Sequence, residues 1–226
     1  MIFVRNHKIF HLKDGGILTE NKLYFTGEST QAEKIPFVKL ESFHWESDPP
    51  YRPETYFKIY VENGVLTAEI KCYESNPRAV CTQTDDTVFK DSCVEFFFSP
   101  VEGRTEYINL EMNSAGTYLC EYGNMKPDRR FIKELTPLFP EVTASKSSDA
   151  NGEFWAVKSR VSKELIAALY KVEPQSITFE KIRANIYKCG DLCEIKHYEA
   201  FSPVTTLPPG FHNPACFAEF IKTEIE

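Results

Sequence analysis

Carboxylate, amide and guanidinium side chains recur at alternate positions in three apolar segments of this sequence. Glu95 lies in CVEFFF, Asn109 and Glu111 lie in YINLEMN, and Arg183 and Asn185 lie in RANIY. These groups make bidentate or two-way hydrogen bonds. Placing them in an otherwise apolar strand is costly unless they are solvated, paired or directed at a polar ligand.

Aromatic rings are interleaved with these polar groups, at Phe89, Tyr107 and Tyr187. Sugars require this combination, because their hydroxyl groups donate and accept, and the C–H face of a pyranose lies flat on an aromatic ring. The same residues also fit one solvated face of an antiparallel sheet, where cross-strand Arg–Glu pairs need no ligand. The pattern alone leaves both interpretations open.

Catalysis is the competing interpretation of the acidic residues. Asp91 and Glu95 stand four residues apart in a predicted strand, which places them about 13 Å apart on one face. That separation exceeds those of retaining and inverting glycosidase pairs. The sequence contains no GxSxG, no HExxH and no glycine-rich phosphate loop. The spacing therefore argues against Asp91 and Glu95 acting together as a catalytic pair.

Period-two alternation dominates the chain and must position these residues. Asn63-Gly64 predicts a hairpin within 57–73, and Asn151-Gly152 predicts a second one. One helix is expected near 162–170, with Ser162 as its N-cap. The sequence predicts an all-β fold, a jelly-roll-like antiparallel β-sandwich with one short helix. Because no linker divides the chain, we expect one domain over 1–226, with 1–34 as an N-terminal extension of it.

Composition excludes several partners. The net charge of −7 argues against nucleic acid, and no segment has the length of a membrane span or the charge of a membrane-binding patch. Charges interrupt the first residues, so no signal peptide is recognised and a cytoplasmic location is expected, or an extracellular one if the sequence lacks its leader. Seven scattered cysteines fit a reducing compartment, and Cys189 and Cys193 lack the second pair that a zinc site requires.

Six segments, in this order, carry a family resemblance: FKDSCVEFFFSP, YINLEMNSAG, FWAVKSRV, RANIYKCGD, HYEAFSP and GFHNPACFAEF. Together they resemble the family-9-like carbohydrate-binding modules, within the wider group of DOMON-type β-sandwiches, from about Ile35 to the C-terminus. The resemblance implies a module that binds saccharides without cleaving them, with the sugar held between two aromatic rings. It also implies a link to carbohydrate catabolism.

The resemblance also implies a set of site residues. The two rings fall on Phe89 and Phe201, where relatives tend to carry Trp, and the hydrogen-bonding positions fall on Glu95, Arg183 and Asn185. Glu95 is thus the expected ligand-binding acid. Asp91, at the entry of the strand, is expected to serve a structural role by accepting backbone or arginine hydrogen bonds. With the neighbouring polar positions, the predicted carbohydrate-binding site is Phe89, Glu95, Asn109, Glu111, Arg183, Asn185 and Phe201.

No cofactor is expected. Structural calcium, found in some members, stays open because the sequence has no DxDxDG loop. The expected partner is a mono- or oligosaccharide or a glycan chain end, and the sequence does not identify the sugar or the oligomeric state. Two alternatives remain: a glycoside hydrolase, xylanase-like, that uses Asp91, Glu95 or Glu111, and a structural or regulatory sandwich without a sugar ligand.

Overall fold

A computed structural model describes residues 9–11, 17–19, 21–27, 29–43, 50–205 and 210–225. Within these residues, thirteen strands join one large sheet. Its neighbours, in order, are β10-β9-β8-β7-β13-β15-β3-β5-β6-β12-β11, while β14 pairs with β13 and β4 with β5. Strands β1 and β2 form a separate two-stranded sheet. The strands are β1 (Ile9–His11), β2 (Ile17–Thr19), β3 (Asn21–Thr26), β4 (Val38–Lys39), β5 (Glu54–Glu62), β6 (Val65–Tyr73), β7 (Cys93–Ser99), β8 (Tyr107–Asn113), β9 (Tyr118–Gly123), β10 (Arg130–Phe131), β11 (Glu141–Asp149), β12 (Gly152–Val161), β13 (Lys181–Cys189), β14 (Tyr198–Ala200) and β15 (Ala218–Glu224).

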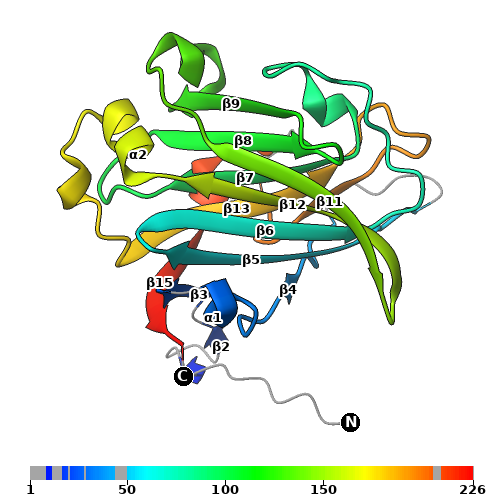
Figure 1. The fold of residues 1–226 in the computed structure, drawn as a ribbon, viewed down its shortest axis with the longest axis horizontal. Coiled ribbons are helices and arrows are strands. Elements are labelled where there is room, and N and C mark those ends of the chain that lie inside the picture. Colours follow the sequence, from blue (N-terminus) through cyan, green and yellow to red (C-terminus); the bar gives the residue numbers. More distant parts are fainter. Residues whose placement is uncertain are drawn as a thin grey trace.

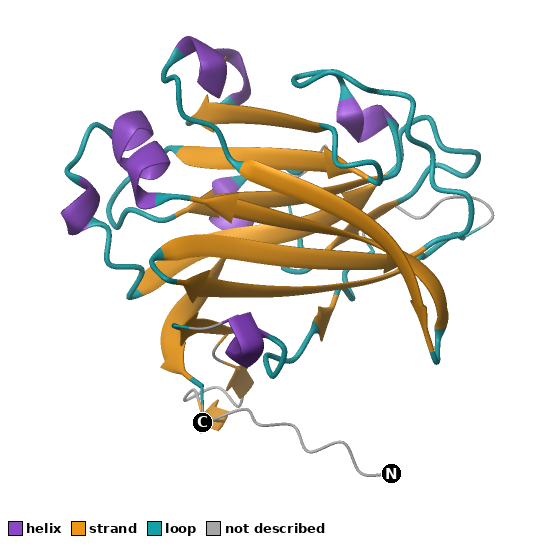
Figure 2. Ribbon diagram, viewed as in Figure 1, coloured by secondary structure: helices purple, strands orange, loops and turns teal. Residues whose placement is uncertain are grey.

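The large sheet curls into two layers (Figures 1 and 2). The layer of β5, β6, β12 and β11 lies in front of the layer of β7, β8 and β13 in this view. Strands β15 and β3 connect the two layers. This arrangement confirms the predicted all-β sandwich.

Alternation along the strands explains the core between the layers. Leu110 of β8, Ile186 of β13 and Phe96 of β7 point inward from one layer, and Ile70 of β6 and Val157 of β12 point inward from the other. All five are at most 1% exposed. The polar neighbours of Leu110, Ile186 and Phe96 must therefore point to the outer face of the β7–β8–β13 layer, because successive strand residues face opposite sides.

The strand pairing departs from the prediction in one respect. β15 pairs with β3, and β3 pairs with β5, in parallel, so the sheet is not wholly antiparallel. Hairpin signals identify only strands joined by tight turns, and these two pairings join segments far apart in the sequence.

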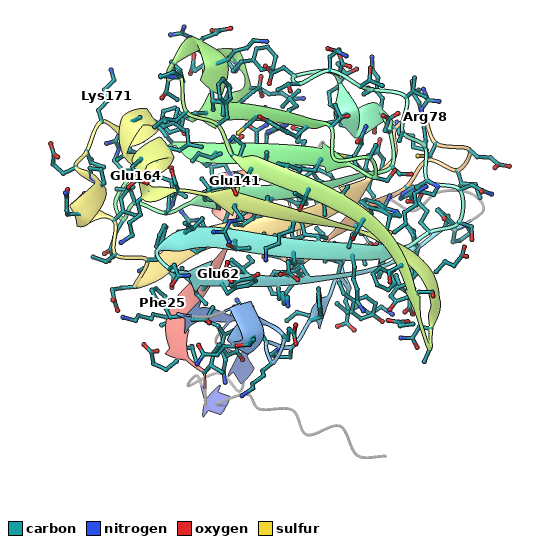
Figure 3. The ribbon with its side chains drawn as sticks, in the orientation of Figure 1. Phe25, Glu62, Arg78, Glu141, Glu164 and Lys171 are labelled. Carbon is teal, nitrogen blue, oxygen red and sulfur yellow. The ribbon has the colours of Figure 1, made fainter. Side chains whose placement is uncertain are left out.

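Both predicted hairpins form, as β5–β6 and β11–β12. In the first, Asn63 and Gly64 have positive φ angles of 49° and 80°, as a two-residue turn of this type requires. The predicted helix is α2 (Lys163–Tyr170), and Ser162 Oγ accepts a hydrogen bond from Leu165 N at 3.2 Å. Figure 3 shows Glu164 in its first turn and Lys171 at its end.

A second, four-residue helix, α1 (Ser29–Ala32), has no counterpart in the prediction. Within the described residues, five short 3-10 helices lie in loops: η1 (Val88–Lys90), η2 (Lys126–Asp128), η3 (Ile132–Glu134), η4 (Pro174–Ser176) and η5 (Pro214–Cys216). None of the helices in the described ranges combines the length and apolar character that a membrane crossing requires.

Candidate functional site

The three polar segments singled out in the sequence are adjacent strands. β7 pairs with β13 on one side and with β8 on the other, and the register aligns Tyr187, Glu95 and Glu111 in one row across the sheet. The next row contains Asn185, Phe97 and Asn109. One outer sheet face therefore carries most of the predicted polar residues.

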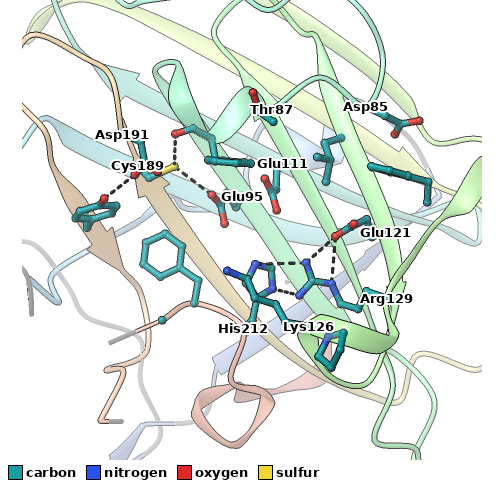
Figure 4. A pocket seen from close by; sticks show the side chains of 17 residues that line it. Asp85, Thr87, Glu95, Glu111, Glu121, Lys126, Arg129, Cys189, Asp191 and His212 are labelled. Atoms are coloured by element: carbon teal, nitrogen blue, oxygen red, sulfur yellow. Dashed lines mark hydrogen bonds and ion pairs between the residues drawn. The ribbon is translucent and has the colours of Figure 1, made fainter. Parts of the chain in front are cut away.

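Loops cover this face and leave a pocket of about 960 Å³ (Figure 4). That volume is within the range of about 300 to 1,000 Å³ that is typical of small-molecule sites. The lining residues are Asp85, Thr87, Phe89, Glu95, Glu111, Leu119, Glu121, Lys126, Pro127, Arg129, Phe131, Cys189, Asp191, Tyr198, Gly210, Phe211 and His212.

Two buried carboxyl groups lie side by side in the pocket (Figure 4). Glu95 and Glu111 are each 3% exposed. Glu95 Oε1 accepts a hydrogen bond from Cys189 Sγ at 3.1 Å, and Glu111 Oε1 accepts one from Asn109 Nδ2 at 3.0 Å. Glu111 Oε2 is buried without a hydrogen-bond partner.

Burial controls the protonation of both carboxyl groups. It raises the pKa of Glu111 to about 7, and the hydrogen bond from Asn109 only partly opposes this effect. Burial, with the nearby Cys189 and Glu111, raises the pKa of Glu95 well above its ordinary value. Burial therefore favours the neutral form of both carboxyl groups, and a neutral carboxyl group can donate as well as accept a hydrogen bond.

A cationic group stands on another side of the pocket. Arg129, whose side chain is 5% exposed, donates to Glu121 Oε2 from Nη2 at 2.6 Å and from Nε at 3.2 Å. It also contacts His212 Nδ1 and donates to the Tyr107 hydroxyl at 3.1 Å. Burial, together with the charge of Arg129, lowers the pKa of His212 to about 3, so the imidazole is neutral.

Aromatic side chains complete the lining. Phe89, Phe131, Tyr198 and Phe211 are half-buried around a small apolar cluster. Phe211 stacks on the buried Tyr187 with ring centroids 4.1 Å apart and planes 12° apart. The Tyr198 hydroxyl donates to Asp191 Oδ1 at 2.5 Å. Rings held in this way are pre-positioned to contact the apolar face of a ligand.

The loop that carries Phe89 is anchored by Asp91. This fully buried carboxylate accepts hydrogen bonds from the backbone N–H groups of Val80 and Cys81 at 2.9 and 2.8 Å. Arg78, labelled on the same loop in Figure 3, lies 3.2 Å from Asp91 Oδ1. These hydrogen bonds confirm the expected structural role of Asp91, although it precedes β7 rather than belonging to it.

Four of the seven predicted site residues are brought together. Phe89, Glu95 and Glu111 line the pocket. Asn109, which is fully buried, lies behind the lining and holds Glu111 and Glu121 through its Nδ2, at 3.0 and 3.4 Å. Asn109 thus positions two carboxyl groups and does not itself line the pocket.

The other three lie outside the pocket lining. Arg183 donates to the Pro214 carbonyl, and Asn185 Nδ2 donates to the Ser202 carbonyl at 2.9 Å. Both side chains therefore anchor the C-terminal segment to the sheet. Phe201 is half-buried and packs against the core instead, with its ring centroid 4.9 Å from that of Phe57. The expected pair of rings, Phe89 with Phe201, is thus not found around this pocket.

Several lining residues were not selected from the sequence. Arg129, Glu121, Asp191, Tyr198, Phe211 and His212 come from loops, short strands and the end of β9. Loops carry no periodic signal, so only the folded chain reveals that these residues meet. The concentration of aromatic and polar residues in GFHN, within the irregular tail, is a local sequence feature that could have indicated part of this set.

Comparison with known proteins gives one family match. The sequence profile of carbohydrate-binding family 9 matches residues 25–221, which is most of the chain. A comparison with curated proteins finds no match.

Solved structures give the same architecture. A protein from Bacteroides uniformis ATCC 8492, provisionally described as carbohydrate-binding, is 25% identical with a TM-score of 0.73, and the match covers 90% of this chain and 99% of that one. Family 9 modules from Caldicellulosiruptor kristjanssonii, in complex with glucose and with cellotriose, are 10% and 9% identical with TM-scores of 0.60 and 0.56. These two matches cover 90% and 91% of this chain and 96% and 94% of the others, and at this identity they show the fold alone.

Proposed function

Because the chain belongs to carbohydrate-binding family 9, a family of non-catalytic binding modules, we propose that it binds a saccharide in the pocket on the outer face of β7, β8 and β13. The observation that carries this proposal is the combination, in one pocket, of two buried carboxyl groups, a buried guanidinium group and half-buried aromatic rings. The proposed ligand is a mono- or oligosaccharide or a glycan chain end, and the proposed role is in carbohydrate catabolism.

The chemistry of a sugar complements each part of this pocket. Hydroxyl groups would donate to Glu111 Oε2, which is buried and unpartnered, and would form further hydrogen bonds with the carboxyl group of Glu95, which lines the same pocket. The C–H face of the ring would lie on Phe89 or Phe211. A few charge-assisted hydrogen bonds and stacking contacts, less the cost of ordering, correspond to a micromolar Kd, about −6 to −8 kcal/mol.

The placement of the acids supports binding over cleavage. Glycoside hydrolysis uses two carboxyl groups that flank the scissile bond. Glu95 and Glu111 instead lie side by side on neighbouring strands of one sheet face (Figure 4). Both can therefore contact one side of a sugar, but they do not enclose it.

A broad glycan array followed by calorimetric titration tests this function. We expect saturable binding of at least one class of saccharide, including gluco-oligosaccharides because family 9 modules bind glucose and cellotriose. The same preparation is assayed on aryl glycosides and on xylo- and gluco-oligosaccharides. Turnover that Glu95→Gln abolishes would establish the hydrolase alternative, and an array without hits would favour a sandwich without a sugar ligand.

A pair of phenylalanine variants separates stacking from core packing. Phe89→Ala should weaken saccharide binding by about 1 to 3 kcal/mol with little loss of stability, because a half-buried pocket ring contributes little to the core. Phe201→Ala removes a ring packed against Phe57 and Phe220. It should lower the free energy of unfolding by about 2 to 4 kcal/mol and leave the Kd of the folded protein nearly unchanged.

Thermal melts and calorimetric titrations on both proteins provide the readouts. Strong destabilisation of Phe89→Ala would show that Phe89 is a core ring and would refute the site proposed from the pocket. A binding defect in Phe201→Ala would instead place Phe201 in the site, as the sequence predicted.

A further inference from the structure

We propose that Cys93, Glu95 and Cys189 form a binding site for a thiophilic divalent cation, of which Zn²⁺ is the best fit, at the bottom of the pocket. The thiol sulfurs and a carboxylate oxygen of these residues all lie within 4.8 Å of one another. Among the residues that the structure describes, no other group of three or more His, Cys, Asp or Glu side chains is arranged in this way.

The sheet register produces this cluster. Cys93 of β7 and Cys189 of β13 are directly opposite each other in an antiparallel pair, and Glu95 follows two residues after Cys93 on the same face. All three are at most 3% exposed. Because each side chain extends from a central strand, the donor atoms are held in place before any ion binds.

The donor set selects the kind of ion. Zn²⁺ lies about 2.3 Å from thiolate sulfur and about 2.0 to 2.2 Å from carboxylate oxygen, so donors in a tetrahedral site lie about 3.5 to 3.8 Å apart. Separations within 4.8 Å require only a small contraction. Two sulfur donors disfavour Ca²⁺ and Mg²⁺, which bind oxygen.

The surroundings of the three ligands give the ion a route from solvent and leave room for a fourth ligand. Glu95 and Cys189 line the pocket, so an ion can enter from solvent. Three protein ligands leave one tetrahedral position for water, and the buried, unpartnered Oε2 of the adjacent Glu111 is a suitable acceptor for that water. An ionised carboxylate buried beside two thiols is costly without a counter-charge, and a bound cation would supply that charge.

This site differs from the zinc site considered in the sequence. Cys193, the second cysteine of the CxxxC pair, lies beside Ser92 Oγ at 3.4 Å and outside the cluster. The partner of Cys189 is instead Cys93, which is 96 residues earlier in the chain and recognisable only from the fold.

Cobalt titration of the full chain, kept reduced with a phosphine, tests the site. We expect one equivalent of Co²⁺ to produce thiolate-to-cobalt charge-transfer absorption that Zn²⁺ abolishes. Cys93→Ser and Cys189→Ser should each weaken Zn²⁺ binding at least about 100-fold, measured by competition with a chromophoric chelator. Cys193→Ser and Cys81→Ser should bind as the wild type does.

A second measurement uses only the wild-type protein, so it does not depend on the folding of the variants. One equivalent of Zn²⁺ should protect Cys93 and Cys189 from alkylation during partial unfolding, as identified by peptide mass. Three results would each overturn the site: no cobalt–thiolate absorption, a wild-type affinity for Zn²⁺ in the Cys93→Ser and Cys189→Ser proteins, or protection of Cys193 in place of Cys93 and Cys189. None of these readouts involves a saccharide, so their failure is distinguishable from failure of the proposed function.

Discussion

The Glu111→Gln protein is expected to be more stable than the wild type at pH 8 and to bind saccharide about 10- to 100-fold more weakly. Burial raises the pKa of Glu111 from 4.5 to about 7 in the folded protein. The stabilisation of the wild type that comes from the protonated form is fully present below pH 4.5 and is lost as the pH rises through about 7. Glutamine is neutral throughout and avoids this loss.

The size of the effect follows from the pKa. A rise from 4.5 to about 7 corresponds to about 3 kcal/mol, so the advantage of the variant should increase by about 2 to 3 kcal/mol between pH 4.5 and pH 8. Urea unfolding of both proteins at both pH values, with a chelator present to exclude metal, measures this difference in the free energy of unfolding. The substitution also removes the charged hydrogen-bond acceptor that the Glu111 carboxylate offers to the saccharide. This loss should weaken saccharide binding by about 1.5 to 3 kcal/mol.

The exposed Glu102 provides the matched control. Its side chain is 82% exposed, so Glu102→Gln should change neither the pH dependence nor the Kd. Equal pH profiles of Glu111→Gln and the wild type would show that the Glu111 carboxylate is better solvated than its burial indicates.

Replacing Arg129 with alanine should strongly reduce both stability and saccharide binding. The substitution leaves Glu121, 18% exposed, without its bidentate partner and removes a hydrogen-bond donor to the Tyr107 hydroxyl. Breaking a buried ion pair from one side costs about 3 to 5 kcal/mol, and partial exposure of Glu121 favours the lower end. We also expect at least a tenfold loss of saccharide affinity, because the pocket wall loses its cation and its support.

Two further variants separate the effect of the charge at position 129 from that of its geometry and from that of a nearby exposed arginine. Arg129→Lys keeps the charge but not the bidentate geometry, so it should recover part of the stability and part of the affinity. Arg130→Ala changes the neighbouring residue, which is 55% exposed and paired with Glu134, and should alter stability by less than about 0.5 kcal/mol. Wild-type affinity in folded Arg129→Ala would exclude this wall of the pocket from the binding site.

The sequence predicted what depends on local periodicity. Alternation in YINLEMN and RANIY placed Leu110 and Ile186 in the core and Asn109 and Glu111 on the outer face, and both hairpins and α2 formed where turn and capping residues predicted them. The family resemblance added Phe89 and Glu95, which line the pocket.

What the sequence could not predict depends on tertiary contacts. A polar face of β13 is as consistent with anchoring a loop as with binding a ligand, and Arg183 and Asn185 anchor the C-terminal segment. Phe201 could equally be a pocket ring or a core ring, and its contact with Phe57 shows the latter. Arg129 lies in a loop segment with no pattern, and its role became visible only where that segment covers the sheet.

Chemical-shift mapping during a saccharide titration tests most directly whether the pocket on the outer face of β7, β8 and β13 binds a saccharide. Isotopically labelled protein is titrated with cellotriose or with the best saccharide from the array, and amide and methyl shifts are followed. We expect saturable shifts concentrated at Phe89, Glu111, Leu119, Arg129 and Phe211, with none of comparable size in β5, β6 or β12. Saturable shifts centred on another surface, or no saturable binding to any saccharide, would contradict this expectation.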